Sequence, residues 1–197
     1  MDKGFKLDKG TIVLNRKMTE LDLFVKDFLS IIEKHSKYLI VSGFVSIASG
    51  RTRGTEDVDM LLPIMGKTSF SNLFKELISG GFWCLQGDTS DEVYSYIKDF
   101  HNIRFARANE VFPNMEVIPI DKMRKTKWFE FEHPQRMRVE TFEFDVPQLE
   151  FEILYKESIL KGEKDLADAK HLRTFFKAIL KEEKFKEFKP IIELESR

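Results

Sequence analysis

The sequence is poor in the residues that build disulfide frameworks and structural zinc sites. It contains one cysteine, Cys84, and four histidines that lie far apart along the chain. These numbers exclude a disulfide framework and leave no zinc-ligand spacing. No apolar run approaches the roughly 20 residues of a membrane span, and the first ten residues, MDKGFKLDKG, lack the apolar stretch of a secretory signal. We therefore expect a protein of the reducing cytoplasm that has no membrane partner.

An excess of charge of one sign is also lacking. Lys and Arg total 32 and Asp and Glu total 33, so the formal net charge is −1. Such a balance gives no overall attraction for nucleic acid, and any binding of this kind must come from a local patch. The chain is instead rich in apolar residues, at 42% of the total with 19 Phe. This content excludes a disordered chain and predicts a packed core, and 197 residues correspond to one domain with a small appendage.

The hydrophobic pattern divides the chain into a mixed front part and a helical tail. Short apolar runs predict strands at 10–15, 38–41, 57–62, 102–106, 115–120 and 137–146. Helical spacing predicts helices at 21–32, 44–49, 71–78, 149–160 and 166–180, and the segment 122–138 is expected to be an irregular excursion. We therefore predict an α+β fold, with a mixed sheet flanked by helices in residues 1–147 and a helical segment in residues 148–197.

Two aspartates on one predicted strand carry the strongest chemical signal. Asp57 and Asp59 alternate with apolar residues in the segment DVDMLL. Residues i and i+2 of a strand share a face, with Cα atoms roughly 6.5 Å apart, so both carboxylates project the same way. Burying two like charges together is costly unless a cation offsets them. Mg²⁺ prefers carboxylate oxygens together with substrate phosphates, so the pair predicts a site for Mg²⁺, or for Mn²⁺ in its place.

A turn upstream of the acid pair is suited to phosphate binding. Ser42 and Gly43 follow the strand at 38–41 and precede the helix at 44–49. A strand-to-helix junction offers backbone N–H groups and the positive end of a helix to an anion, and glycine allows close approach.

These two segments together resemble the nucleotidyltransferase superfamily, the polymerase-β-like fold. Its pattern is a strand, a Gly-Gly or Gly-Ser turn, a short helix, and then Arg-x-Thr-x-Asp-x-Asp on a strand. The segment Arg53–Asp59, RGTEDVD, is similar to the second block at every fixed place, and Ser42-Gly43 stands at the turn. The resemblance implies that Asp57 and Asp59 ligate the metal ion, and that Ser42, Gly43, Arg53 and Thr55 belong to the nucleotide site.

A third carboxylate usually joins the pair in this superfamily, and two candidate places are open. Glu116 interrupts the apolar run Met115–Ile118. Glu143 and Asp145 alternate with aromatic residues, as on an ordinary solvated strand face. We favour Glu116, because a carboxylate inside an apolar run needs a cation or a hydrogen-bond donor beside it.

The tail adds a second point of similarity. Lys156, followed by the segment Lys164–Asp168, KDLAD, resembles the Lys and basic-Asp-x-x-Asp helix of small prokaryotic nucleotidyltransferase-like proteins of the toxin–antitoxin and abortive-infection type. By this resemblance Lys156 contacts the triphosphate and Asp165 completes the site. The structural alternatives are a solvated Lys156, and Asp165 and Asp168 that interact only with a helix dipole.

Three basic features have alternative interpretations. Arg53 contacts a phosphate or forms an ion pair with Glu56 or Asp57. The spacing of Lys170, Arg173, Lys177 and Lys181 makes one basic stripe on the predicted tail helix, which is a solvated face or a track for a polynucleotide. The cluster of Lys122, Arg124, Lys125 and Lys127 beside Trp128 invites the same two interpretations.

The sequence therefore favours a metal-dependent nucleotidyltransferase. It would transfer a nucleoside monophosphate from a nucleoside triphosphate to a hydroxyl of an RNA end, a protein or a small molecule. The alternative is a nucleotidyltransferase-like binding module that acts as an antitoxin or regulator without turnover. A metal-dependent phosphoesterase is a weaker third possibility, because the histidine clusters common in such sites are missing.

Overall fold

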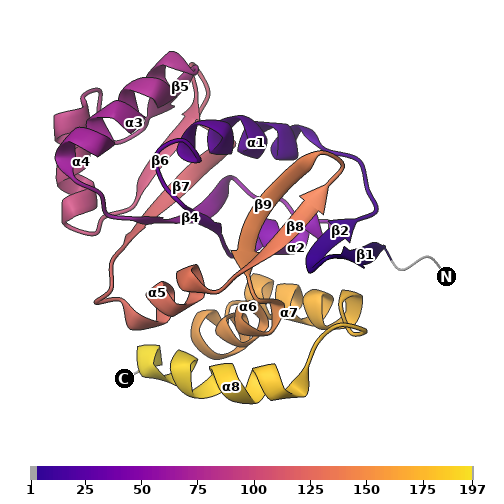
Figure 1. Ribbon diagram of the computed structural model, residues 1–197. Helices are drawn as coiled ribbons and strands as arrows, with labels where there is room; N and C mark the ends of the chain where they lie inside the picture. The colour runs from indigo at the N-terminus through magenta and orange to yellow at the C-terminus, as the bar shows by residue number, and fades with distance from the viewer. Residues whose placement is uncertain (1–3, 197) are drawn as a thin grey trace.

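The computed structural model describes residues 4–196, which form two β-sheets covered by helices (Figure 1). The five-stranded sheet has the order β3-β4-β7-β6-β5. Its strands are β3 (Leu39–Ile40), β4 (Asp57–Pro63), β5 (Phe82–Cys84), β6 (Ile103–Arg107) and β7 (Asn114–Ile120). β4 and β7 are parallel neighbours, whereas the other pairs in this sheet are antiparallel. The predicted α+β class is therefore confirmed, with a mixed sheet at its centre.

The second sheet joins the beginning of the chain to a later hairpin. Its order is β1-β2-β8-β9, with β2 parallel to β8 and the other pairs antiparallel. The strands are β1 (Phe5–Asp8), β2 (Thr11–Leu14), β8 (Pro134–Val139) and β9 (Phe142–Pro147). β9 lies against β3, and the rings of Phe44 and Phe144 are 5.5 Å apart, so the two sheets share one core.

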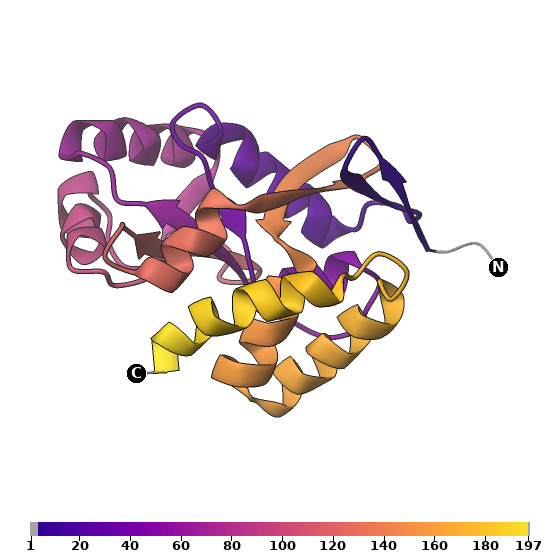
Figure 2. The same cartoon turned by 60° about the horizontal axis from the view of Figure 1, so that its bottom comes forward.

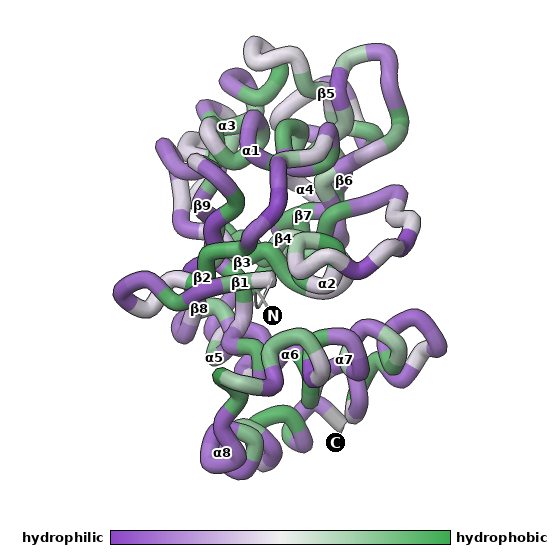
Figure 3. The backbone as a smooth tube through the Cα atoms, turned by 90° about the vertical axis from the view of Figure 1, so that its right-hand side faces the viewer, coloured by the Kyte–Doolittle hydropathy of each residue, from purple (hydrophilic) through white to green (hydrophobic). Residues whose placement is uncertain are grey.

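Helices of the front part cover the five-stranded sheet. They are α1 (Glu20–Ile32), α2 (Gly43–Ala48), α3 (Lys67–Ser79), α4 (Ser90–Lys98) and α5 (Lys125–Glu132). α1 begins at a capping box, in which the Asp22 N–H donates to Thr19 Oγ1 and the Thr19 N–H donates to the Asp22 carboxylate. Its buried face carries Phe24, Phe28 and Ile32 at helical spacing. The hydrophobic stretches, green in Figure 3, run through the middle of the molecule around β4 and β7.

The tail forms a helical layer beside the sheets (Figure 2). It consists of α6 (Leu149–Tyr155), a π-helical turn (Lys156–Leu160), α7 (Glu163–Phe175), α8 (Glu182–Glu193) and a 3₁₀ turn (Leu194–Ser196). The last strand ends at Pro147 and α6 begins at Leu149. Within residues 4–196, no helix is both long enough and apolar enough to cross a membrane.

Several expected elements differ from the structure. Residues 90–98, for which no helix was predicted, form α4, which begins at a Thr89 cap. The predicted excursion at 122–138 contains the ordered helix α5 and most of β8. The tail helix α7 ends at Phe175 rather than at residue 180, and α8 follows after a short turn. α5 has almost no apolar stripe, so its order comes from tertiary contacts that periodicity does not report.

The packing of α1 on the sheet gives a first testable prediction. Phe28 has no exposed surface, and its ring lies 5.1 Å from that of Phe82 and 5.8 Å from that of Phe105. Phe28→Ala should lower the free energy of unfolding by about 3–5 kcal/mol, because it leaves a cavity in a close-packed core. Leu23→Ala, on the same helix at 39% exposure, is the control, with an expected loss below about 1 kcal/mol. Urea titration measures both values, and equal losses would contradict the packing.

Candidate active site

Strand β4 places Asp57 and Asp59 on one face, as the sequence predicts. Val58 and Met60, which alternate with them, are fully buried, whereas both aspartates are partly exposed. On the parallel neighbour β7, Asn114 lies opposite Asp57 and Glu116 lies opposite Asp59. We call Asp57 and Asp59 the acid pair. The strand register therefore brings the favoured third carboxylate next to this pair.

The acid pair carries negative charge that the protein does not neutralise. Burial, together with the charges of Asp57 and Glu116, raises the pKa of Asp59 to about 7, although a hydrogen bond from Ser42 acts in the opposite direction. Within residues 4–196, neither Asp57 nor Asp59 forms an ion pair with a basic side chain. This arrangement favours a bound cation, because a cation would stabilise both carboxylates in their charged form.

Glu116 is held by other groups in the present arrangement. Its Oε1 accepts hydrogen bonds from Arg104 Nη2 at 2.6 Å and from Asn102 Nδ2 at 3.0 Å. In the part of the chain that the structure describes, no three His, Cys, Asp or Glu side chains already form a metal-ligating group. The acid pair therefore supplies two carboxylates without a basic partner within residues 4–196, and Glu116 lies beside them with its charge compensated by Arg104.

The other candidates for the third carboxylate lie in the second sheet. Asp145 on β9 accepts hydrogen bonds from Arg136 at 2.6 and 3.0 Å. Glu143 forms ion pairs with Arg136 and Arg138. Both therefore belong to cross-strand ion pairs between β8 and β9, as the solvated-strand interpretation expects.

The Ser42-Gly43 turn has a backbone conformation that favours glycine. Ser42 has φ 64° and ψ −130°, which lies outside the regions that L-residues normally occupy. Gly43 is needed for a different reason, because a Cβ there would lie 3.0 Å from the Arg53 guanidinium nitrogens. The turn thus brings the Ser42 hydroxyl to Asp59 at the cost of backbone strain, a feature that is typical of functional sites.

Thr55 and Arg53 hold the loop that leads into the acid pair. Thr55 Oγ1 donates to the backbone oxygen of Asp57 at 2.7 Å, which fixes the start of β4. Arg53 Nη1 donates to Asp168 Oδ2 at 2.6 Å. The expected ion pair of Arg53 with Glu56 or Asp57 is therefore wrong, because the guanidinium reaches the tail instead.

Asp168 on α7 is the centre of a buried ion cluster. Its side chain has no exposed surface and forms ion pairs with Arg51, Arg53 and Lys156. Asp165, which the sequence singled out, is partly exposed and lies 3.8 Å from Lys156 Nζ. We call Asp168 and its three cations the Asp168 cluster. The helix dipole interpretation of Asp168 is therefore wrong, since three specific cations hold this carboxylate.

Lys156 is buried among carboxylates. Its side chain has no exposed surface, and Nζ lies 3.2 Å from both Glu152 Oε1 and Asp168 Oδ2. Burial opposes its charge, but these two carboxylates outweigh burial and raise the pKa of Lys156 above its ordinary value. The solvated-lysine alternative is therefore wrong, since Glu152 and Asp168 hold the buried ammonium group, and the triphosphate contact stays a prediction.

Cavities lie on two sides of the acid pair. One of about 620 Å³ borders Asp57, and its cationic lining residues are Arg51, Arg53 and Lys164. Another of about 220 Å³ borders Ser42 and Asp59 and reaches to Ile118, Lys127, Glu152 and Tyr155. The acid pair is thus accessible from both sides, and the first side carries the basic groups suited to phosphates.

The basic stripe expected on the tail helix does not form. α7 ends at Phe175, so Lys177 and Lys181 lie beyond it. Arg173 bonds to Glu157 at 2.6 and 2.8 Å and stacks over Phe185. The four basic residues therefore do not share one helix face, and their contact with a polynucleotide stays a prediction.

Trp128 is partly buried, and its stacking on a nucleic-acid base stays a prediction. It packs against a small buried cluster formed by Leu39, Val41, Leu61 and Ile120.

Comparison with known proteins supports the fold and leaves the activity open. No family model and no curated protein matches the sequence. Among solved structures, the chain is similar to an antigenic nucleotidyltransferase-like protein from Paracoccidioides brasiliensis, with a TM-score of 0.51 and 14% identity over 83% of this chain and 79% of that one. The chain therefore has a nucleotidyltransferase-like α+β fold.

The Asp168 cluster gives the second prediction. Asp168→Asn should lower the free energy of unfolding by about 3–5 kcal/mol, because it leaves buried Lys156 and two arginines without their shared anion. Asp165→Asn is the matched control on the same helix, and its expected loss is below about 1 kcal/mol. Urea unfolding measures both. A smaller loss for Asp168→Asn than for Asp165→Asn would show that Asp165 is the central carboxylate.

The strained turn gives the third prediction. Ser42→Gly should raise the free energy of unfolding by about 1 kcal/mol, because relief of about 1–3 kcal/mol of strain exceeds the entropic cost of glycine, about 0.5–1 kcal/mol. Ser42→Ala removes the same hydroxyl but keeps the strain, so it should not stabilise the protein. Thermal unfolding of the two variants compares them directly, and a destabilised Ser42→Gly would refute the strain.

Proposed function

We propose that the protein is a metal-dependent nucleotidyltransferase that uses a nucleoside triphosphate. The observation that carries this proposal is the acid pair itself. Asp57 and Asp59 lie on one face of β4, and each of them borders a cavity. Glu116 lies opposite Asp59 and pairs with Arg104. Neither Asp57 nor Asp59 has a basic partner within residues 4–196. The fold likeness to a nucleotidyltransferase-like protein supports it.

The acid pair fits Mg²⁺ or Mn²⁺. Mg²⁺ is commonly bound by one or two carboxylates plus substrate phosphates and water. The burial and neighbouring carboxylates that raise the pKa of Asp59 support a cation at this place. Asp57 and Asp59 would hold the ion, and Glu116 would join them after release from Arg104. The bound ion supplies charge neutralisation at the phosphates and polarises the α-phosphorus.

The chain's own residues would orient the nucleotide. Arg51, Arg53 and Lys164 line the cavity beside Asp57, where a triphosphate would meet positive charge. The Ser42-Gly43 turn presents backbone to the other side of Asp59. In the transfer, the acceptor hydroxyl oxygen forms a bond to the α-phosphorus, the bond from that phosphorus to pyrophosphate breaks, and the hydroxyl proton leaves to solvent.

The acid pair gives the fourth prediction. Asp57→Asn and Asp59→Asn should each abolish transfer of label from a nucleoside triphosphate, because each removes a charge that holds the ion. Glu116→Gln should lower transfer far more than Asp145→Asn, which serves as the matched control in the second sheet. The test is incubation with four labelled nucleoside triphosphates, Mg²⁺ and total RNA and protein. Full activity in Asp59→Asn would sink the assignment.

The stability of Asp59→Asn checks that loss of activity is not loss of fold. The folded pKa of about 7 exceeds the ordinary value of 3.8, so without metal the stability of the native sequence falls as the pH rises from 3.8 to about 7. Asp59→Asn lacks this penalty. In a chelator it should therefore unfold at higher urea than the native sequence at about pH 8, and the difference should shrink toward about pH 4.

A binding module without turnover is the second candidate function. The observation that favours it is the commitment of Glu116 to Arg104 and Asn102, which leaves two free carboxylates rather than three. Calorimetry with ATP and CTP separates the two functions. An enzyme should need Mg²⁺ for tight binding, whereas metal-independent binding without transfer favours the module. A role in a prokaryotic toxin–antitoxin pair and a cytoplasmic location stay predictions.

A further inference from the structure

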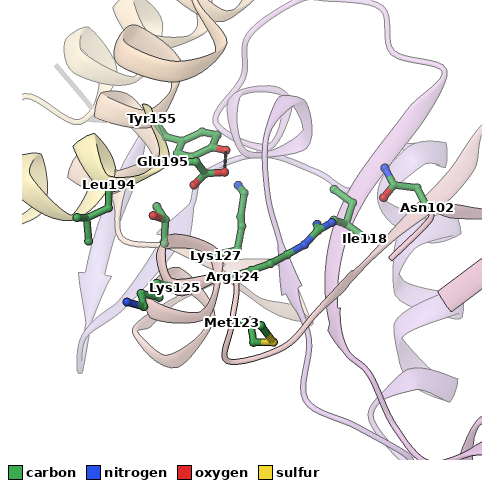
Figure 4. A pocket seen from close by; sticks show the side chains of 10 residues that line it. Asn102, Ile118, Met123, Arg124, Lys125, Lys127, Tyr155, Leu194 and Glu195 are labelled. Atoms are coloured by element: carbon green, nitrogen blue, oxygen red, sulfur yellow. Dashed lines mark hydrogen bonds between the residues drawn. The ribbon is translucent and has the colours of Figure 1, made fainter. Parts of the chain in front are cut away.

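A cavity of about 500 Å³ beside α5 has no role in the site described above (Figure 4). We call it the α5 cavity. Its walls come from the residue before β6, from α5 and its preceding turn, and from the tail. The polar side chains that line it are those of Asn102, Arg124, Lys125, Lys127, Tyr155 and Glu195.

Within the described residues, Arg124 differs from the other arginines in having no carboxylate partner. Of the nine arginines within residues 4–196, the other eight each form an ion pair with Asp or Glu. Arg124 instead lies with its guanidinium carbon 4.9 Å from the centre of the Phe100 ring. Figure 4 shows its side chain extended across the cavity toward Ile118 and Asn102. Arg124 is an exposed residue that contacts the Phe100 ring, and its hydrogen-bond donors stay available to a ligand.

The charges around the α5 cavity are mainly positive. Arg124, Lys125 and Lys127 supply three cations, and the lining carboxylate, Glu195, already accepts a hydrogen bond from the Tyr155 hydroxyl at 2.9 Å. Lys127 pairs with Glu130 at 3.0 Å, and despite burial this carboxylate raises the pKa of Lys127, which keeps it charged. Because Glu130 compensates Lys127, the lining cations without a carboxylate partner within residues 4–196 are Arg124 and Lys125, and these two suit the cavity to an anion.

The α5 cavity adjoins the cavity beside the acid pair, because three residues line both of them. Ile118, Lys127 and Tyr155 line both this cavity and the smaller one that borders Ser42 and Asp59. At its other wall, Asn102 donates to Glu116, the residue opposite Asp59. A molecule bound in the α5 cavity would thus extend toward the acid pair from the side opposite Arg51 and Arg53.

We propose that the α5 cavity binds the acceptor of the transfer through a phosphate group held by Arg124. A guanidinium with free donors binds phosphate oxygens in a bidentate manner, and the cavity volume suits a nucleotide-sized group. The proposal rests on the proposed function, because it assigns the acceptor for that same site. The phosphate would belong to a nucleic-acid end or to a free nucleotide. A hydroxyl of an unmodified protein would bring no such anion.

The experiment compares Arg124→Gln with Arg138→Gln. Arg138 lies on β8, where it pairs with Asp8 and Glu143, so the control removes the same charge outside the site. The probes are a short single-stranded RNA and AMP, each titrated against the full chain at several salt concentrations. Nucleoside triphosphate binding with Mg²⁺ is measured on the same samples.

If the proposal is correct, Arg124→Gln weakens binding of RNA or of AMP about ten- to hundredfold. For RNA, the salt dependence should also flatten by about one unit of log–log slope. Arg138→Gln and triphosphate binding should stay unchanged. Weakened binding of RNA alone identifies a nucleic-acid end, and weakened binding of AMP identifies a free nucleotide.

Two outcomes overturn the inference. One is equal binding of both probes to the two variants. The other is transfer of label to protein, with no binding of RNA or AMP, in which case the proposed transferase stands and the acceptor assignment fails. Conversely, Arg124-dependent binding of a probe in a protein that transfers no label would refute the transferase and leave the phosphate site in place.

Discussion

The buried carboxylate of Asp168 connects the two parts of the chain that the site needs. It receives Arg51 and Arg53 from the loop before β4 and Lys156 from the tail, so a single anion links the core to α6 and α7. Glu152 adds a second contact to Lys156 from one helical turn away. Because removing one member of such a group leaves buried charges without partners, the cluster constrains the position of the tail on the core.

The position of the acid pair follows from this constraint. Arg53 reaches over Gly43 on its way to Asp168, so the turn and the loop are packed together. Thr55 then fixes the start of β4 through the backbone of Asp57. In this arrangement the arginine and the lysine that the sequence suggested as phosphate ligands hold the scaffold. Lys156 is fully buried, whereas Arg53 also lines the cavity beside Asp57.

The charges divide into compensated and uncompensated groups. Glu116 has Arg104, Asp145 has Arg136, and Asp168 has three cations. Within residues 4–196, the acid pair has no basic partner. Among the cations, Arg124 contacts the Phe100 ring and has no carboxylate partner in the same range. The cavities beside these groups share Ile118, Lys127 and Tyr155 in their walls. Charges without an ionic partner that line a cavity are candidate ligand contacts, which is why the transferase proposal and the acceptor proposal both start from these residues.

The sequence by itself determined the local features. The capping box of α1, the strand β4 and the common face of Asp57 and Asp59 depend on residues two to four apart, and the period of two on a strand is independent of context. The α+β class followed from the same patterns. The sequence pattern did not predict α5 or the end of α7. The apolar stripe on α5 is weak, and the turn after Phe175 depends on packing.

Only the tertiary structure decided which charges meet. Lys156 and Asp168 are twelve residues apart and Arg53 is more than a hundred residues from both, so no spacing rule relates them. The register of β4 on β7 likewise sets Glu116 opposite Asp59 across a long sequence separation. Whether a charged side chain binds a ligand or another part of the protein depends on the partners that folding brings within a few ångströms, and that information is absent from local sequence.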